Sequence, residues 1–265
     1  MRTGSGGDVV ICPQIGVVDS SCLFAAESDA KSARAVVLYD PTGLRHKSRQ
    51  HLDWLCRHQD RSRLAAGDGT VGQPAMKTVF LSASIPDPKR DPRFFKTADV
   101  VAIAEAVHAL CTVVLPEDRL VFGGHPAITP IVQRIAVLLD RQRSVAIFQS
   151  AFFVGEFPEE AKKFPNIVVT ERGRDRGDSL RIMREAMLKA RPFAGVFVGG
   201  MEGVIDEWRL LQELHSGTPA WPIPTTGAAA RILFDSREFD RDRRFDETLR
   251  TDPVYARLFR RLLAP

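Results

Sequence analysis

Two glycine pairs, each placed directly after a short apolar run, carry the clearest chemical signal in the sequence. Gly123-Gly124 is followed by His125, and the second pair opens the stretch Gly199-Gly200-Met201-Glu202-Gly203. Glycine allows a ligand or a helix to approach the backbone closely. If a helix starts after each pair, its free N–H groups favour a phosphate. The two turns therefore predict a site for a nucleotide or another phosphorylated ligand, although a glycine pair also serves a tight turn alone.

Hydroxyl and carboxylate side chains accompany these turns. Acids in a first helical turn favour the helix dipole, and this explains Glu202, Asp206 and Glu207 without any ligand. The same carboxylates also suit a ribose hydroxyl or general acid/base chemistry. If the protein is an enzyme, we expect Glu202 and Glu207 to be catalytic. The predicted ligand-binding residues are Ser82, Ser84, Gly123, Gly124, His125, Gly199, Gly200, Met201, Glu202, Gly203 and Thr226.

Basic side chains in two loops offer further contacts to a phosphate, or they simply solvate those loops. They are Lys89, Arg90, Arg93, Arg172, Arg174 and Arg176. Neither glycine pair fits GxGxxG, and GxxxxGK[ST] is absent, so ordinary dinucleotide and P-loop sites are not predicted. The four cysteines lack a CxxC spacing. We therefore predict no metal site, no disulfide framework and no cofactor.

Strands and helices are expected to alternate from residue 78 to about 235. Because the strands are nearly all-apolar, they predict a parallel, Rossmann-like sheet covered by helices on both faces. Right-handed crossovers then bring the strand-to-helix turns to one edge, where such folds bind ligands. These turns are residues 82–84, 123–126, 149–151, 199–203 and 225–227. Thr97 and Asp178 are predicted helix caps, and three prolines in residues 84–93 predict a loop without a helix.

Composition restricts the function. The chain has 265 residues, 26% of them charged, and a net charge of +4. Its arginines are interleaved with acids, which favours solvated faces over a nucleic-acid surface. No apolar run approaches the roughly 18 residues of a membrane helix, and no signal peptide is apparent. We expect a cytoplasmic protein without a membrane partner.

The two ends of the chain differ from its middle. Residues 1–75 show no sustained periodicity, and we expect a poorly structured extension or a loosely docked small element. An alternative hypothesis is that Met76 is the true start, because the first convincing strand begins two residues later. Residues 76–235 form the predicted domain. Residues 236–265 form a predicted helical tail, in which Leu258, Phe259, Leu262 and Leu263 could pack on the body.

Three segments of the sequence together resemble the SLOG superfamily, and most closely its cluster three family. They are 80–86, 121–130 and 198–204, with their Gly-Gly-His-Pro and Gly-Gly-Met-Glu-Gly turns. The superfamily includes the lysine-decarboxylase-like phosphoribohydrolases and the ligand-sensing domains of TRPM channels. The resemblance implies a Rossmann-like domain with a nucleotide-type ligand over about residues 77–235.

The sequence departs from the motif Pro-Gly-Gly-x-Gly-Thr-x-x-Glu of the enzyme branch. Val198 replaces the proline, and the threonine is missing. Without a gap, Asp206 replaces the motif glutamate; with one inserted residue, Glu207 matches it.

The resemblance implies binding or sensing of a nucleotide-derived ligand, in a bacterial conflict or anti-phage defence system. An effector protein encoded nearby and a homo-oligomer are compatible with that role. The alternatives are a nucleotide N-glycosidase and a scaffold with a vestigial site.

Overall fold

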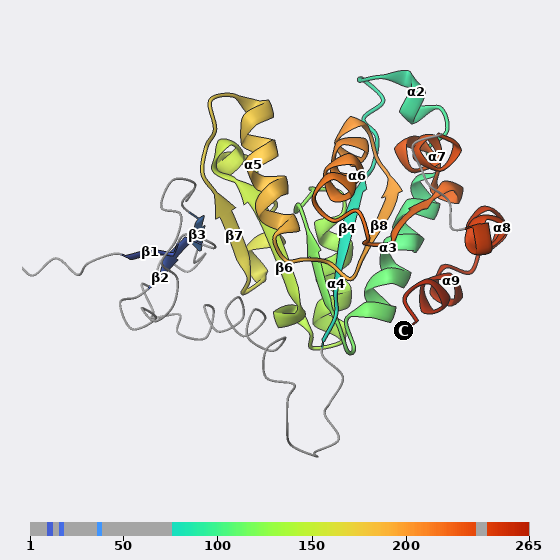
Figure 1. The fold of residues 1–265 in the computed structure, drawn as a ribbon, viewed down its shortest axis with the longest axis horizontal. Helices are drawn as coiled ribbons and strands as arrows, with labels where there is room; N and C mark the ends of the chain where they lie inside the picture. The colour runs from blue at the N-terminus through green and yellow to red at the C-terminus, as the bar shows by residue number, and fades with distance from the viewer. Residues whose placement is uncertain (1–9, 13–15, 19–35, 39–75, 237–242, 265) are drawn as a thin grey trace, which may run out of the picture.

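A computed structural model describes residues 10–12, 16–18, 36–38, 76–236 and 243–264 (Figure 1). Its strands form a small antiparallel pair, β1–β2, and a larger sheet in the order β3-β7-β6-β5-β4-β8-β9. From β7 to β9 all neighbours are parallel, whereas β3 is antiparallel to β7. The strands are β1 (Val10–Cys12), β2 (Gly16–Val18), β3 (Val36–Leu38), β4 (Thr78–Ser84), β5 (Arg119–Phe122), β6 (Val145–Ser150), β7 (Ile167–Thr170), β8 (Ala194–Gly199) and β9 (Ala220–Ile223).

Burial on both faces explains why the central strands are continuous apolar runs. Every residue of β6 and β8 is buried. In the register of the sheet, Leu81 of β4 pairs with Phe122 of β5 and with Val196 of β8. Alternate side chains of a strand enter opposite helical layers, so both sets must be apolar. The predicted Rossmann-like α/β fold is confirmed.

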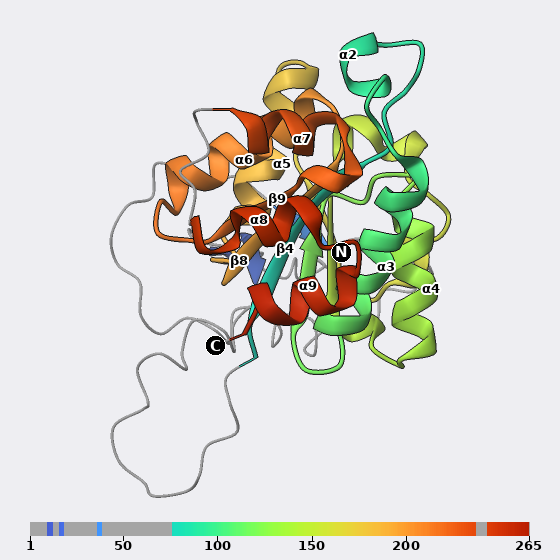
Figure 2. The same cartoon turned by 90° about the vertical axis from the view of Figure 1, so that its right-hand side faces the viewer.

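The helices form one layer on each side of the sheet. Figure 2 shows α3 and α4 on one side and α5 and α6 on the other, with β4 and β8 between them. The α-helices are α2 (Pro92–Phe95), α3 (Val100–Val114), α4 (Thr129–Leu138), α5 (Arg176–Leu188), α6 (Glu202–Leu214), α7 (Ala228–Asp235), α8 (Arg243–Thr251) and α9 (Tyr255–Leu262). Short 3-10 helices include η3 (Ala151–Glu156), η4 (Ala161–Lys163) and η5 (Pro224–Thr226).

Three local predictions were wrong. Helix α3 is capped by Asp99, which accepts from Ala102 N–H, whereas Thr97 Oγ1 accepts from Ala228 N–H at the start of α7. Helix α5 is capped by Asp175 rather than Asp178. A short carboxylate two or three residues ahead of a free N–H competes well for a cap. The proline-rich loop also contains α2, because Pro92 occupies the first helical turn, where its missing N–H costs nothing.

The end of the chain packs on the domain. Helix α9 lies against α3, and its Leu258 and Phe259 are fully buried (Figure 2). Tyr255 OH lies 3.0 Å from Thr225 Oγ1, next to the turn before α7. None of the described helices is long and apolar enough to cross a membrane. The prediction for the N-terminal extension falls largely outside the described residues.

Candidate functional site

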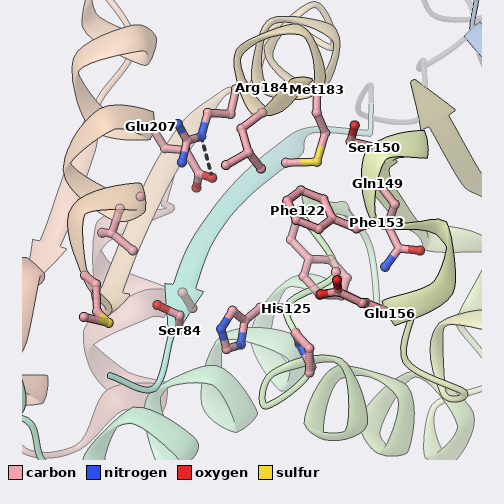
Figure 3. Close-up of a pocket in the computed structure, with 18 of the residues that line it drawn as sticks. Ser84, Phe122, His125, Gln149, Ser150, Phe153, Glu156, Met183, Arg184 and Glu207 are labelled. Atoms are coloured by element: carbon pink, nitrogen blue, oxygen red, sulfur yellow. Dashed lines mark hydrogen bonds and ion pairs between the residues drawn. The ribbon is translucent and has the colours of Figure 1, made fainter. Parts of the chain in front are cut away.

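A cavity of about 430 Å³ opens at the carboxyl ends of β4, β5 and β6. Helices α5 and α6 form one wall, and η3 forms the opposite one (Figure 3). This is the edge at which the strand-to-helix turns were predicted to converge. The volume falls within the range of roughly 300–1,000 Å³ that is typical of small-molecule sites.

The second glycine pair shapes the turn between β8 and α6. Gly199 and Gly200 have φ values of 55° and 84°, which L-residues with a side chain rarely adopt. Gly199 N–H donates to Thr226 Oγ1 (2.9 Å), and Gly200 N–H donates to the Ser84 carbonyl (2.8 Å). A Cβ on Gly199 would collide with Ile103. Protein atoms therefore occupy the space beside this turn, and the turn directs the first residues of α6 to the cavity.

The first glycine pair lies at the cavity itself. Gly124 has a φ of 64°, and a Cβ there would come within 2.7 Å of Ile147 and 2.9 Å of Gln149 Nε2. His125 Nδ1 accepts from Ala127 N–H at 3.2 Å. Burial lowers the pKa of His125, so the ring is neutral at pH 7. Because Nδ1 is an acceptor, Nε2 carries the proton and can donate to a ligand.

An arginine–glutamate pair crosses from α5 to α6 at the wall of the cavity. Arg184 Nε lies 3.3 Å from Glu207 Oε1, and the two side chains are 13% and 14% exposed (Figure 3). Arg184 Nη1 also lies 3.2 Å from Asp206, which is half exposed. Gly203 makes room for this arginine, because a Cβ there would lie 3.0 Å from Nη2.

Burial raises the pKa of Glu207, and the attraction of Arg184 opposes this effect without cancelling it. The hydroxyl of Ser82, on the strand beneath, also lowers the pKa of Glu207. Ser82 Oγ nevertheless makes no hydrogen bond of standard geometry within the described residues. The Glu207 carboxylate is thus largely buried, paired with Arg184 and adjacent to the Ser82 hydroxyl, which has no hydrogen-bond partner among the described residues.

The side of the cavity formed by β6 and η3 is aromatic and polar. Gln149 is only 5% exposed, and its Oε1 has no hydrogen-bond partner in the described part of the chain. Its side chain lies at the cavity beside Phe153 and Ser150 (Figure 3). A buried amide oxygen without a hydrogen bond typically lowers the stability of the folded protein by about 1–3 kcal/mol. Such a group therefore suggests a missing partner, which a ligand could supply.

Some of the predicted residues meet at the cavity and others support it. Gly199, Gly200 and Thr226 build the turn behind α6, Ser82 lies beneath Glu207, and Glu202 pairs with Arg90 at 3.0 Å. The predicted residues that line the cavity are Ser84, Gly123, Gly124, His125, Met201, Gly203 and Glu207. Of the basic loop residues, Arg90 and Arg176 line it, whereas Lys89, Arg93, Arg172 and Arg174 do not.

Sequence reasoning missed Arg184 and did not select Gln149. The turn at residues 149–151 was predicted at the edge where the cavity lies, and a glutamine near the end of an otherwise apolar run was the available signal. Arg184 lies in the middle of a helix with several exposed charges. Nothing in its spacing distinguished it, because its role depends on the neighbouring helix.

The fold and this site define a Rossmann-like α/β domain with a cavity at the carboxyl edge of its sheet. The chain belongs to the SLOG cluster3 family, whose model matches residues 93–263. It is also similar to the X-ray structure of TM1055, a Northeast Structural Genomics Consortium target, at 15% identity and a TM-score of 0.45. That match covers 64% of this chain and 88% of the other. No curated protein matches the chain.

Proposed function

We propose that the cavity binds a nucleotide-derived small molecule and that the domain acts as its sensor. The observation that carries this proposal is Gln149, whose buried Oε1 has no hydrogen-bond partner among the described residues, at a cavity that also contains aromatic and cationic side chains. A nucleobase offers flat faces for an aromatic ring and polar edges for an amide. A purely apolar ligand does not suit this cavity, because the Gln149 oxygen would then stay without a hydrogen bond.

The distribution of groups around the cavity supports an orientation for the ligand. The base would lie toward Phe153 and Gln149 on the η3 side. The phosphate would lie toward the start of α6 and Arg90, where the helix dipole and a guanidinium both favour an anion. Both Glu207 and His125 line the cavity. In this orientation Glu207 would accept from a ribose hydroxyl, and His125 Nε2–H would be a further donor.

A second candidate function is hydrolysis of an N-glycosidic bond, and the buried Arg184–Glu207 pair favours it. In that reaction the bond between the base and ribose C1 breaks, C1 takes the hydroxyl of water, and the base takes the remaining proton. Glu207 in its ionised form would stabilise the positive charge that develops on the ribose. Val204 stands in place of the threonine of the enzyme motif in the alignment that matches Glu207. For this reason we place the sensor first.

A ligand screen tests the proposed function. We expect at least one compound among nucleoside mono-, di- and triphosphates, cyclic nucleotides and NAD to raise the Tm of the purified protein. Gln149→Leu should lower the affinity for that ligand by about tenfold, because the contacts of the Gln149 amide with the base are lost. Gln212→Leu is the matched control, since Gln212 Nε2 is also buried and unpartnered among the described residues but lies outside the cavity.

The outcomes separate the candidates. No shift with any compound would reject the sensor and favour a scaffold with a vestigial site. Chromatography of the same mixtures detects free base. If base is released and Glu207→Gln abolishes the release, the protein is an N-glycosidase instead. A role in bacterial conflict, with an effector encoded nearby, is a further part of the proposal that the neighbouring genes would test.

A further inference from the structure

An ion pair joins the two sides of the cavity rim. Arg90 lies in the loop after β4 and lines the cavity, and Glu202 is the first residue of α6. Arg90 Nη2 and Glu202 Oε2 are 3.0 Å apart, and the side chains are 50% and 40% exposed. The residues that flank Glu202, Met201 and Gly203, both line the cavity. The pair therefore connects the proline-rich loop to the helix terminus at the point where the proposed phosphate would enter.

Glu202 places a negative charge in the first turn of α6. The first N–H groups of a helix lack intrahelical acceptors, and the dipole favours negative charge there. Glu202 supplies that charge from within the chain, and it also supplies the anion for Arg90. A phosphate meets the same two requirements, and it can contact the guanidinium through two parallel hydrogen bonds.

The Arg90–Glu202 ion pair is weak enough for a phosphate to replace Glu202 as the partner of Arg90. Exposed ion pairs contribute between about 0 and 1 kcal/mol to the free energy of unfolding, because water already solvates both partners. The binding free energy of a buried phosphate can exceed this cost. The Oε1 of Gln149, in the same cavity, has no hydrogen-bond partner in the described part of the chain, and this is independent evidence that the site is built for a ligand.

We infer that Arg90 and Glu202 form a latch that an anionic ligand opens. In the empty protein Glu202 holds Arg90 across the rim; in the loaded protein a phosphate group takes Arg90, and Glu202 turns to solvent. This rests on the proposed function for the identity of the ligand, but not for the exchange itself. Glu202 is then a competitor of the phosphate rather than a ligand of the ribose, and the latch selects phosphorylated over unphosphorylated molecules.

Calorimetric titrations with matched probes test the latch. The probes are AMP, adenosine, GMP, guanosine and inorganic pyrophosphate. Glu202→Gln should increase the affinity for AMP, GMP and pyrophosphate by about fivefold at low salt, because the competing carboxylate is removed. Adenosine and guanosine should bind as they do to the wild type. Arg90→Gln should lower the affinity only for the probes that carry a phosphate group.

A double variant separates the latch from a general charge effect. In an Arg90→Gln background, Glu202→Gln should give a smaller gain than in the wild type, because only the competition of Glu202 at the helix terminus is then removed. Glu185→Gln is the charge control: it removes one carboxylate that pairs with Arg181 and lies outside the cavity. Arg93→Gln is the loop control, since Arg93 pairs with Asp91.

Failure of the latch and failure of the proposed function give different results. If nucleotides bind but Glu202→Gln leaves their affinity unchanged, or if Glu185→Gln raises it equally, the latch is rejected and the proposed function stands. If only pyrophosphate binds, more tightly to Glu202→Gln, the latch stands and a nucleotide ligand is rejected. If no probe binds to any variant, the latch is rejected, and the proposed function is rejected with it when the wider nucleotide screen also gives no shift in Tm.

Discussion

At the scale of single residues, the chemistry of the cavity is concentrated in Glu207 and its neighbours. Its carboxylate pairs with Arg184, and the buried Ser82 hydroxyl lies beneath it. Burial of a charge costs more than one long ion pair returns, and therefore the pKa of Glu207 is raised. A carboxylate of this kind can change its protonation state when a ligand displaces water or an arginine from it.

The raised pKa of Glu207 makes stability depend on pH. The folded state retains the proton at a pH where the unfolded chain has lost it, so the free energy of unfolding falls as pH rises through that interval. We expect wild type to lose stability relative to Glu207→Gln between about pH 5 and pH 8, whatever constant offset the substitution adds. Urea unfolding at both pH values measures the difference. If the difference in free energy of unfolding between the two proteins stays constant with pH, or changes with the opposite sign, the pKa of Glu207 is not raised.

At the scale of elements, the turn from β8 to α6 is held from three sides. Ser84 of β4 accepts from Gly200, Thr226 of η5 accepts from Gly199, and Ile103 of α3 fills the space next to Gly199. Thr226 Oγ1 also donates to the Ile223 carbonyl at 2.6 Å. The start of α6 is thus fixed relative to the sheet before any ligand arrives. A fixed helix terminus is what a preformed anion site requires.

Substitution of Gly199 should therefore be severe. Gly199→Ala combines a positive φ with a collision against Ile103, and we expect a loss of about 2–4 kcal/mol in the free energy of unfolding. The control is Gly217→Ala, where no atom lies within 4 Å of the added Cβ. That change should be neutral within about 0.5 kcal/mol. Equal effects of the two substitutions in chemical denaturation would disprove the packing argument.

At the scale of the whole molecule, the two C-terminal helices pack on the body that contains the sheet. The family match extends to residue 263, and α9 buries Leu258 and Phe259 against the layer that contains α3. Tyr255 also contacts Thr225, which precedes the threonine that holds the glycine turn. The last helix is therefore part of the hydrophobic core, and through Thr225 and Thr226 it supports the glycine turn at the start of α6.

Truncation of a core side chain in α9 measures this contribution. Phe259→Ala should lower the free energy of unfolding by about 3–5 kcal/mol, because it leaves a cavity in a closed core. Val254→Ala, at a position that is 48% exposed, should change it by less than about 1 kcal/mol. If Phe259→Ala proves as mild as the control, the tail would be peripheral to the fold.

The sequence by itself determined the sheet, because runs such as residues 145–148 and 194–199 are apolar at every position and only a strand covered on both faces satisfies that pattern. It also placed the strand-to-helix turns at one edge, since crossovers in parallel sheets have a fixed hand. Helix caps were less certain, because several acids and hydroxyls compete over a few residues, as Thr97 and Asp99 do.

Only the tertiary structure decided which side chains of those turns meet at the cavity. Glu202 and Glu207 are both acids near the start of one helix, yet a difference of five residues rotates one to the rim and the other to the buried wall. Arg184 and Gln149 became part of the site through packing between elements far apart in the chain. Spacing along a helix or strand specifies a face, whereas the partner of that face depends on how the layers pack.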